Sequence, residues 1–133
     1  MKRLLALTVC VILLAFSACI GSDYTQAKSG DYLILSVTLE VEEDSTLIDY
    51  MNRIKGSKSL TNFKIKNGML TVINGMQARG NVYWMLYTDD SEYSNSDWGT
   101  VEIEGITYYS ATLGAESLPI KQGCTYVWYA QAF

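Results

Sequence analysis

The chain has 133 residues, with 10 basic and 14 acidic side chains, a net charge of −4 and no histidine. A nucleic-acid-binding protein needs a basic surface to displace counterions from phosphates, so we expect no nucleic-acid partner. The lack of histidine excludes Ser-His-Asp and Cys-His catalysis, histidine-ligated zinc or haem, and an imidazole pH switch.

Residues 1–18 have the layout of a secretory signal peptide. Lys2 and Arg3 form a short cationic start, and an apolar run broken only by Thr8 follows over 4–16. This run is too short for a membrane-spanning helix, which needs about 20 apolar residues. The alternatives are an N-terminal membrane anchor or a buried helix, but the run lacks the polar periodicity of a core helix.

The segment Ala15-Phe16-Ser17-Ala18-Cys19 resembles the lipobox of bacterial lipoproteins. In that family the signal is cut just before the cysteine, which carries acyl chains, although leucine is usual where Phe16 stands here. The resemblance implies lipid at Cys19, which makes the membrane a partner and anchors the protein outside the cytoplasm on the bacterial cell membrane. Two or more acyl chains hold a protein stably, at about 0.8 kcal/mol per buried CH₂. Cleavage after Ser17 or Ala18 without lipid would instead give a secreted protein.

The cysteines fit a lipidated chain without a disulfide. Cys10 leaves with the signal peptide and Cys19 carries lipid, so Cys124 alone remains. We expect Cys124 to be a buried structural thiol, because a nucleophilic cysteine needs a base partner.

The first half of the mature chain is predicted to hold a tether, a strand and a helix. Residues 19–31 are mostly polar and small, which is typical of a flexible tether. Apolar and polar residues alternate over 33–42, which predicts a strand with one buried face. Apolar side chains at Leu47, Ile48, Met51 and Ile54 predict a helix over 46–55. The oxygens of 44–46 are its N-cap candidates, and Gly56 suits the left-handed position after it.

The second half is predicted to be almost entirely strands. A hairpin is expected over 63–73 around Asn67-Gly68, with a second turn at Asn74-Gly75. Strand 82–88 is apolar on both faces, so we expect it to be central or covered. A loop over 89–99, a short hairpin over 100–110 and a closing strand over 125–133 complete the chain. The order predicts an α+β fold, with one helix packed on a mixed or antiparallel sheet of several hairpins.

Four motifs resemble the DUF4430 family, a small β-grasp-like domain also found at the C-terminus of transcobalamin and intrinsic factor. They are the segment 44–51 after the first strand, the turn 73–76, the aromatic strand 83–87 and the closing segment 123–128. The insert after Thr88 and the Gly123-Cys124 pair depart from the family pattern. The resemblance implies a β-grasp-like domain over 32–133, secreted or lipid-anchored. In bacteria such domains often stand beside uptake of cobalamin or other small molecules.

Aromatic residues crowd the chain after residue 81, and we expect most of them to pack in the core. Some are candidates to line an apolar surface for a flat ligand, a sugar or a protein partner. Tyr93 and Trp98 lie in the polar predicted loop, and Tyr87 lies at its mouth. Tyr109 belongs to an adjacent tyrosine pair, one of which we expect to be exposed.

The acidic residues of the predicted loop are candidate calcium ligands: Asp89, Asp90, Glu92 and Asp97. Their spacing does not match a twelve-residue EF-hand loop, so we expect solvated charges, with no metal and no cofactor. No nucleophile–base pair is apparent either, so we expect no enzyme.

The sequence therefore favours a lipid-anchored extracytoplasmic module that binds a small molecule, with a cobalamin-like ligand as one candidate. The alternative is an accessory lipoprotein that contacts other envelope proteins and has no small-molecule ligand. A concave, partly apolar pocket near Trp98 would favour the first hypothesis, and a flat aromatic patch of several hundred Å² the second.

Overall fold

The computed structural model describes residues 24–133, which form one helix and two β-sheets. The first sheet is mixed and has the strand order β1 (Thr25–Gln26), β5 (Met76–Gln77), β4 (Met69–Ile73) and β3 (Phe63–Lys66). The second is antiparallel, with the order β2 (Tyr32–Ser36), β9 (Thr125–Ala132), β6 (Val82–Thr88), β8 (Ile106–Ala111) and β7 (Ser94–Ile103). The α+β class is thus confirmed, but the strands divide into two sheets where one was expected.

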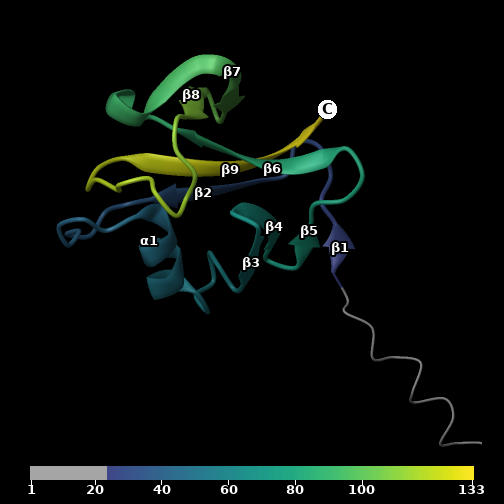
Figure 1. Ribbon diagram of the computed structural model, residues 1–133, viewed down its shortest axis with the longest axis horizontal. Helices are drawn as coiled ribbons and strands as arrows, with labels where there is room; N and C mark the ends of the chain where they lie inside the picture. The colour runs from purple at the N-terminus through teal and green to yellow at the C-terminus, as the bar shows by residue number, and fades with distance from the viewer. Residues whose placement is uncertain (1–23) are drawn as a thin grey trace, which may run out of the picture.

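Strands β2, β9 and β6 form the middle layer of the molecule (Figure 1). Helix α1 (Leu47–Ile54) and the β3–β5 strands lie on one side of this layer, and the β7–β8 hairpin lies on the other. The main core fills the first side and includes Leu35, Met51, Trp84, Tyr126 and Trp128. A smaller core fills the second side and consists of Tyr87, Ile103, Tyr108 and Val127.

The helix begins where its capping signal stands. Thr46 is the N-cap, its hydroxyl oxygen accepts from the Asp49 amide, and the Asp49 carboxylate accepts in return from the Thr46 amide. This reciprocal capping box satisfies two of the amides that a helix start leaves unpaired. Gly56 follows with φ +93°, as its predicted left-handed position requires.

The asparagine–glycine turns are confirmed. Asn67 and Gly68 have φ of 53° and 76°, the left-handed values of a type I′ turn, and they join β3 to β4. Asn74 and Gly75 likewise join β4 to β5, with φ of 49° and 77°. These turns set the register of the first sheet.

The predicted tether is wrong from Thr25 onward. Strand β1 pairs in parallel with β5, and the Ala27 amide donates to the Gln77 carbonyl at 2.8 Å. The Ala27 side chain is buried in the main core, and the Gly30 amide donates to Ala130. The segment is polar in composition, which predicted a flexible tether. It is ordered because its backbone pairs with the edge of β5, and side-chain composition does not predict backbone pairing.

The first predicted strand is too long. Strand β2 ends at Ser36, although Val37 still exchanges backbone hydrogen bonds with Gly123 and Cys124. Its partner β9 begins only at Thr125, so residues 38–42 have no strand to pair with. Leu39 is consequently exposed despite its place in the alternating pattern.

The predicted loop 89–99 is wrong in its second half. A 3₁₀ turn covers Ser91–Tyr93, and β7 starts at Ser94. Asn95 is opposite Ser110 and Thr100 is opposite Tyr109, so residues 96–99 bulge out between neighbouring pairs. Strand β7 lies at the sheet edge with most of its residues exposed, which explains why its sequence shows no apolar alternation.

The β7–β8 hairpin folds back over the middle layer. The Tyr32 hydroxyl of β2 donates to Glu104 in the β7–β8 turn at 3.3 Å. The turn of this hairpin therefore reaches across to the opposite edge strand of the same sheet, which closes the smaller core.

None of the helices described between residues 24 and 133 has the length and apolar character to cross a bilayer.

We predict that Thr46→Ala lowers the free energy of unfolding by about 0.5–2 kcal/mol, because the Asp49 amide loses its acceptor. Urea unfolding followed by circular dichroism measures the change. Thr38→Ala is the matched control, since Thr38 is exposed in the segment after β2. Equal effects of the two substitutions would contradict the capping role.

Candidate functional site

An apolar pocket of about 340 Å³ opens beside β6. We call it the tryptophan pocket. Its walls come from the β3–β4 turn and the start of β4, from β6, the β7 bulge, the end of β8 with the segment after it, and one residue of β9. The lining residues are Gly68, Met69, Leu70, Trp84, Met85, Leu86, Tyr87, Trp98, Ser110, Ala111, Thr112, Leu113, Gly114, Ala115 and Trp128.

The pocket exists because β8 separates from β6. The two strands pair only at Tyr87 and Thr88, whereas β6 pairs with β9 along its whole length. Over Val82–Leu86, the sheet described here has β9 as the single neighbour of β6. The open edge of β6 and the chain that leaves β8 then form the two sides of the hollow.

Four aromatic side chains, three of them tryptophans, line the pocket. Trp84 and Trp128 are buried in the main core, while Trp98 on the β7 bulge is 74% exposed. No residue among those that line the pocket carries a charge. Such a surface suits an uncharged ligand that is held by ring contacts.

The buried hydrogen-bond donors of the pocket are used, with one exception. The Trp84 indole donates to the Met76 carbonyl at 3.3 Å, the Tyr87 hydroxyl to Gln131 at 2.6 Å, and the Ser110 hydroxyl to Asn95 at 2.7 Å. The Trp128 indole Nε1 has no partner among residues 24–133, although Trp128 is only 5% exposed. Leaving a buried donor unpaired costs about 1–3 kcal/mol.

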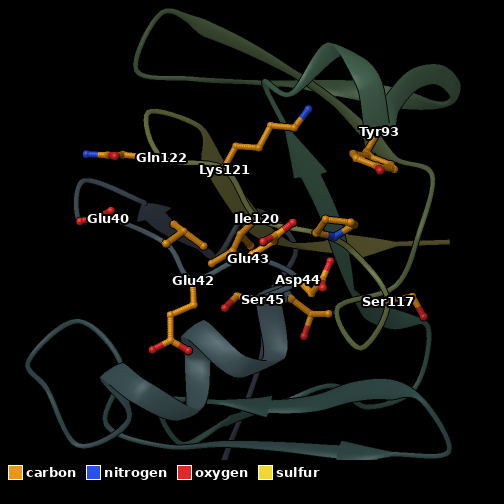
Figure 2. A pocket seen from close by; sticks show the side chains of 13 residues that line it. Glu40, Glu42, Glu43, Asp44, Ser45, Tyr93, Ser117, Ile120, Lys121 and Gln122 are labelled. Carbon is orange, nitrogen blue, oxygen red and sulfur yellow. The ribbon is translucent and has the colours of Figure 1, made fainter.

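A second, more polar hollow lies between the segment after β2 and the segment that precedes β9 (Figure 2). Four acidic residues on one side, Glu40, Glu42, Glu43 and Asp44, stand opposite Lys121 and Tyr93. In Figure 2 the side chains of Glu40 and Glu42 point in different directions and do not converge on one point. Their carboxylates therefore provide no shared binding site.

Lys121 is engaged by the acidic residues that follow β6. Its ammonium donates to Asp90 at 3.2 Å and to Glu92, and it lies 5.3 Å from the centre of the Tyr93 ring. The hydrogen bond to Glu92 is the main reason that the pKa of Lys121 is raised. We call these four residues the lysine cluster. It ties the 3₁₀ turn to the segment before β9, a structural role.

Asp90 is the buried member of the lysine cluster, at 4% exposure. Its Oδ1 accepts from the Glu92 amide and from Lys121, while Oδ2 has no partner within residues 24–133. In the described part of the chain, no three Asp, Glu, Cys or His side chains are grouped to hold a metal ion. Asp89, Asp90, Glu92 and Asp97 thus do not come together as a calcium site.

The four aromatic candidates separate. Tyr87 and Trp98 both line the tryptophan pocket. Tyr93 belongs instead to the lysine cluster, and Tyr109 is exposed on β8 outside the pocket lining. The structure therefore brings Tyr87 and Trp98 together and leaves Tyr93 and Tyr109 apart from them.

The residues that sequence reasoning missed are Trp84, Trp128 and the segment 110–115. Both tryptophans lie in apolar strands, where a core role was the natural interpretation, and both are indeed buried. That they border a pocket depends on where β8 leaves β6, which no sequence pattern reveals.

Cys124 is partly buried and forms no disulfide within residues 24–133. Burial, and next the Asp90 and Asp89 carboxylates, raise the pKa of its thiol. It is therefore protonated at neutral pH, which fits the expected structural role. Cys19 lies outside the described residues.

Comparisons with protein-family models, with curated proteins and with solved structures found no match to this chain. The resemblance to the DUF4430 family stays a prediction.

Because of Tyr126, the free energy of unfolding should fall as the pH rises through the alkaline range. Burial raises the pKa of this tyrosine from 10.0 to about 12. It outweighs the hydrogen bond that the hydroxyl oxygen accepts from the Lys121 amide at 3.0 Å, which lowers the pKa. The folded chain thus holds the phenol proton more tightly than the unfolded chain. The stabilisation is complete below pH 10 and is lost as pH rises from 10 to about 12.

We predict that Tyr126→Phe reduces the loss of stability in this pH range by up to about 1.4 kcal/mol per pH unit. Urea unfolding at several pH values between 9 and 12 gives the slope for both proteins. The contributions of other buried tyrosines remain in both, so the difference reports Tyr126. Identical slopes would refute the assignment.

Proposed function

We propose that this chain is a lipid-anchored, extracytoplasmic binding module that holds a small molecule in the tryptophan pocket. The observation that carries the proposal is the pocket itself: a concave, uncharged hollow with three tryptophans, one of them Trp98. A concave pocket beside Trp98 is the feature that favours a small-molecule ligand over a flat protein-binding patch.

The size of the pocket limits what it holds. Ligand pockets measure about 300–1,000 Å³, and the tryptophan pocket is near the lower end, at about 340 Å³. It suits a molecule of two or three fused rings, or one edge of a larger molecule such as a cobalamin. Cobalamin is therefore one compound to test rather than the expected occupant.

Binding, rather than catalysis, is the activity that we propose. The chain contains no histidine, and the thiol of Cys124 has a raised pKa. The lining of the tryptophan pocket holds no carboxylate, lysine or cysteine to act as nucleophile, acid or base.

The fold supports a relation to β-grasp-like domains such as DUF4430, which we include in the proposal. A helix packs against a sheet, the Asn74-Gly75 turn forms, and the two aromatic motifs lie in the neighbouring strands β6 and β9. The strands of this chain divide into two sheets, and a relation to β-grasp-like domains has to explain that division.

We predict that a bound small molecule quenches the tryptophan fluorescence of the mature chain 19–133 carrying Cys19→Ser. Cobalamins, haem, simple glycans and flat aromatic compounds form the test panel. Trp98→Ala should weaken binding of a hit at least about tenfold, because a pocket aromatic supplies on the order of 1.4 kcal/mol or more.

Tyr109→Ala is the matched control for Trp98→Ala, since Tyr109 is an exposed aromatic outside the pocket. It should leave the affinity unchanged. A panel without any hit would shift the weight to an envelope protein partner. A hit that is insensitive to Trp98→Ala would place the site elsewhere.

We predict that the protein expressed in bacteria with its own N-terminus fractionates with membranes and incorporates labelled fatty acid. Cys19→Ser should abolish the label and release the protein, because the thiol is the attachment point for the acyl chains. Cys124→Ser is the matched control and should keep both properties. Labelling that persists in Cys19→Ser would refute the lipid anchor.

A further inference from the structure

One residue of the tryptophan pocket lining, Trp128, carries a buried donor without a hydrogen-bond partner among residues 24–133. Trp128 is nine-tenths buried, lines the pocket, and its Nε1 has no hydrogen-bond partner among residues 24–133. A native fold rarely leaves a buried donor unpaired, so this atom calls for a partner from outside the described chain.

The other donors show what is special about Trp128. Trp84, in the same pocket, gives its indole hydrogen to the Met76 carbonyl at 3.3 Å. Tyr87 gives its hydroxyl hydrogen to Gln131 at 2.6 Å. Trp128 is consequently the buried side chain in the pocket with a donor still to offer.

We propose that the ligand of the tryptophan pocket is a flat, uncharged ring system with a hydrogen-bond acceptor on its edge, and that this acceptor binds the Nε1–H of Trp128. The inference rests on the proposed function, that the pocket binds a small molecule. Ring contacts favour a flat shape, and the uncharged lining selects against ionised molecules. The buried indole N–H of Trp128, which has no partner among residues 24–133, selects a ligand with an acceptor.

Because Nε1 is covered in the structure, the acceptor reaches it only as the rim adjusts. Met69, Trp98 and Leu113 are the exposed apolar side chains of the pocket lining, so they have room to move. The hydrogen bond then satisfies a donor that is otherwise unpaired. It should therefore contribute more to the affinity than a hydrogen bond whose donor was bonded to water before the ligand arrived.

Quinoline and naphthalene test the proposal, because they share one shape and differ in a single ring nitrogen, which accepts but does not donate. Both are uncharged at neutral pH. The protein is the mature chain 19–133 carrying Cys19→Ser, with its tryptophan indoles labelled with ¹⁵N. Its indole N–H signals are assigned from the Trp84→Phe, Trp98→Phe and Trp128→Phe variants, whose remaining signals also show that each variant is folded.

We expect both compounds to bind and quinoline to bind about five- to tenfold more tightly, as one hydrogen bond to a buried donor predicts. Quinoline should move the Trp128 N–H signal downfield, and naphthalene should not. Trp128→Phe should abolish the preference for quinoline, because its nitrogen then has no donor to bind. Trp84→Phe, the matched loss of an indole N–H that is already used, should keep the preference for quinoline.

Two failures are distinguishable. If both compounds bind with equal affinity, or if the preference survives Trp128→Phe, the pocket is a binding site but the role of Trp128 is overturned. If neither compound, nor any member of the fluorescence panel, perturbs an indole signal, the proposed function falls and this inference falls with it.

Discussion

The structure depends on a single strand that is buried from both sides. Strand β9 pairs with β2 along one edge and with β6 along the other, and its side chains supply both cores. Tyr126, Trp128 and Ala130 face the helix and the first sheet, while Val127 faces the smaller core under the β7–β8 hairpin. Period-2 alternation normally buries one face of a strand, and here both faces are apolar because both are covered. A change of register in β9 would disrupt two cores at once.

The tryptophan pocket is a consequence of this arrangement. Strand β8 has to pair with β6 and also carry the β7–β8 hairpin back over the middle layer, where Tyr32 holds its turn. Strand β8 does this by leaving β6 after two residue pairs. The edge of β6 that it abandons, with Trp84 beneath it, becomes one wall of a hollow. A longer β6–β8 ladder would fill the pocket with backbone, so the curvature that closes the smaller core also opens the site.

Local signals in the sequence were sufficient for the elements whose cause is local. The helix with its N-cap among residues 44–46, the asparagine–glycine turns and the aromatic strand β6 were all predictable. Elements that depend on a distant partner were not. Strand β1 exists because β5 offers it an edge, β2 stops where β9 has not yet begun, and β7 is an exposed edge with no apolar pattern.

The residues of the tryptophan pocket also differ in how far the sequence could identify them. Trp98 was predictable as an aromatic residue in a polar segment, whereas Trp128 became a candidate only through its unpaired nitrogen.

The ordering of β1 changes how an anchored domain would stand on a membrane. In the proposed anchored form, six residue steps separate Cys19 from Thr25 of β1, and a chain of six steps reaches at most about 20 Å. With the proposed cleavage before Cys19, Lys2 and Arg3 are removed, which leaves 14 acidic residues against 8 basic ones, so an anionic lipid surface would repel the chain. Lipid at Cys19 would therefore hold the domain close while charge keeps it from lying flat. An uncharged pocket suits that location, because a neutral flat molecule approaches an anionic surface without the electrostatic barrier that an anion meets.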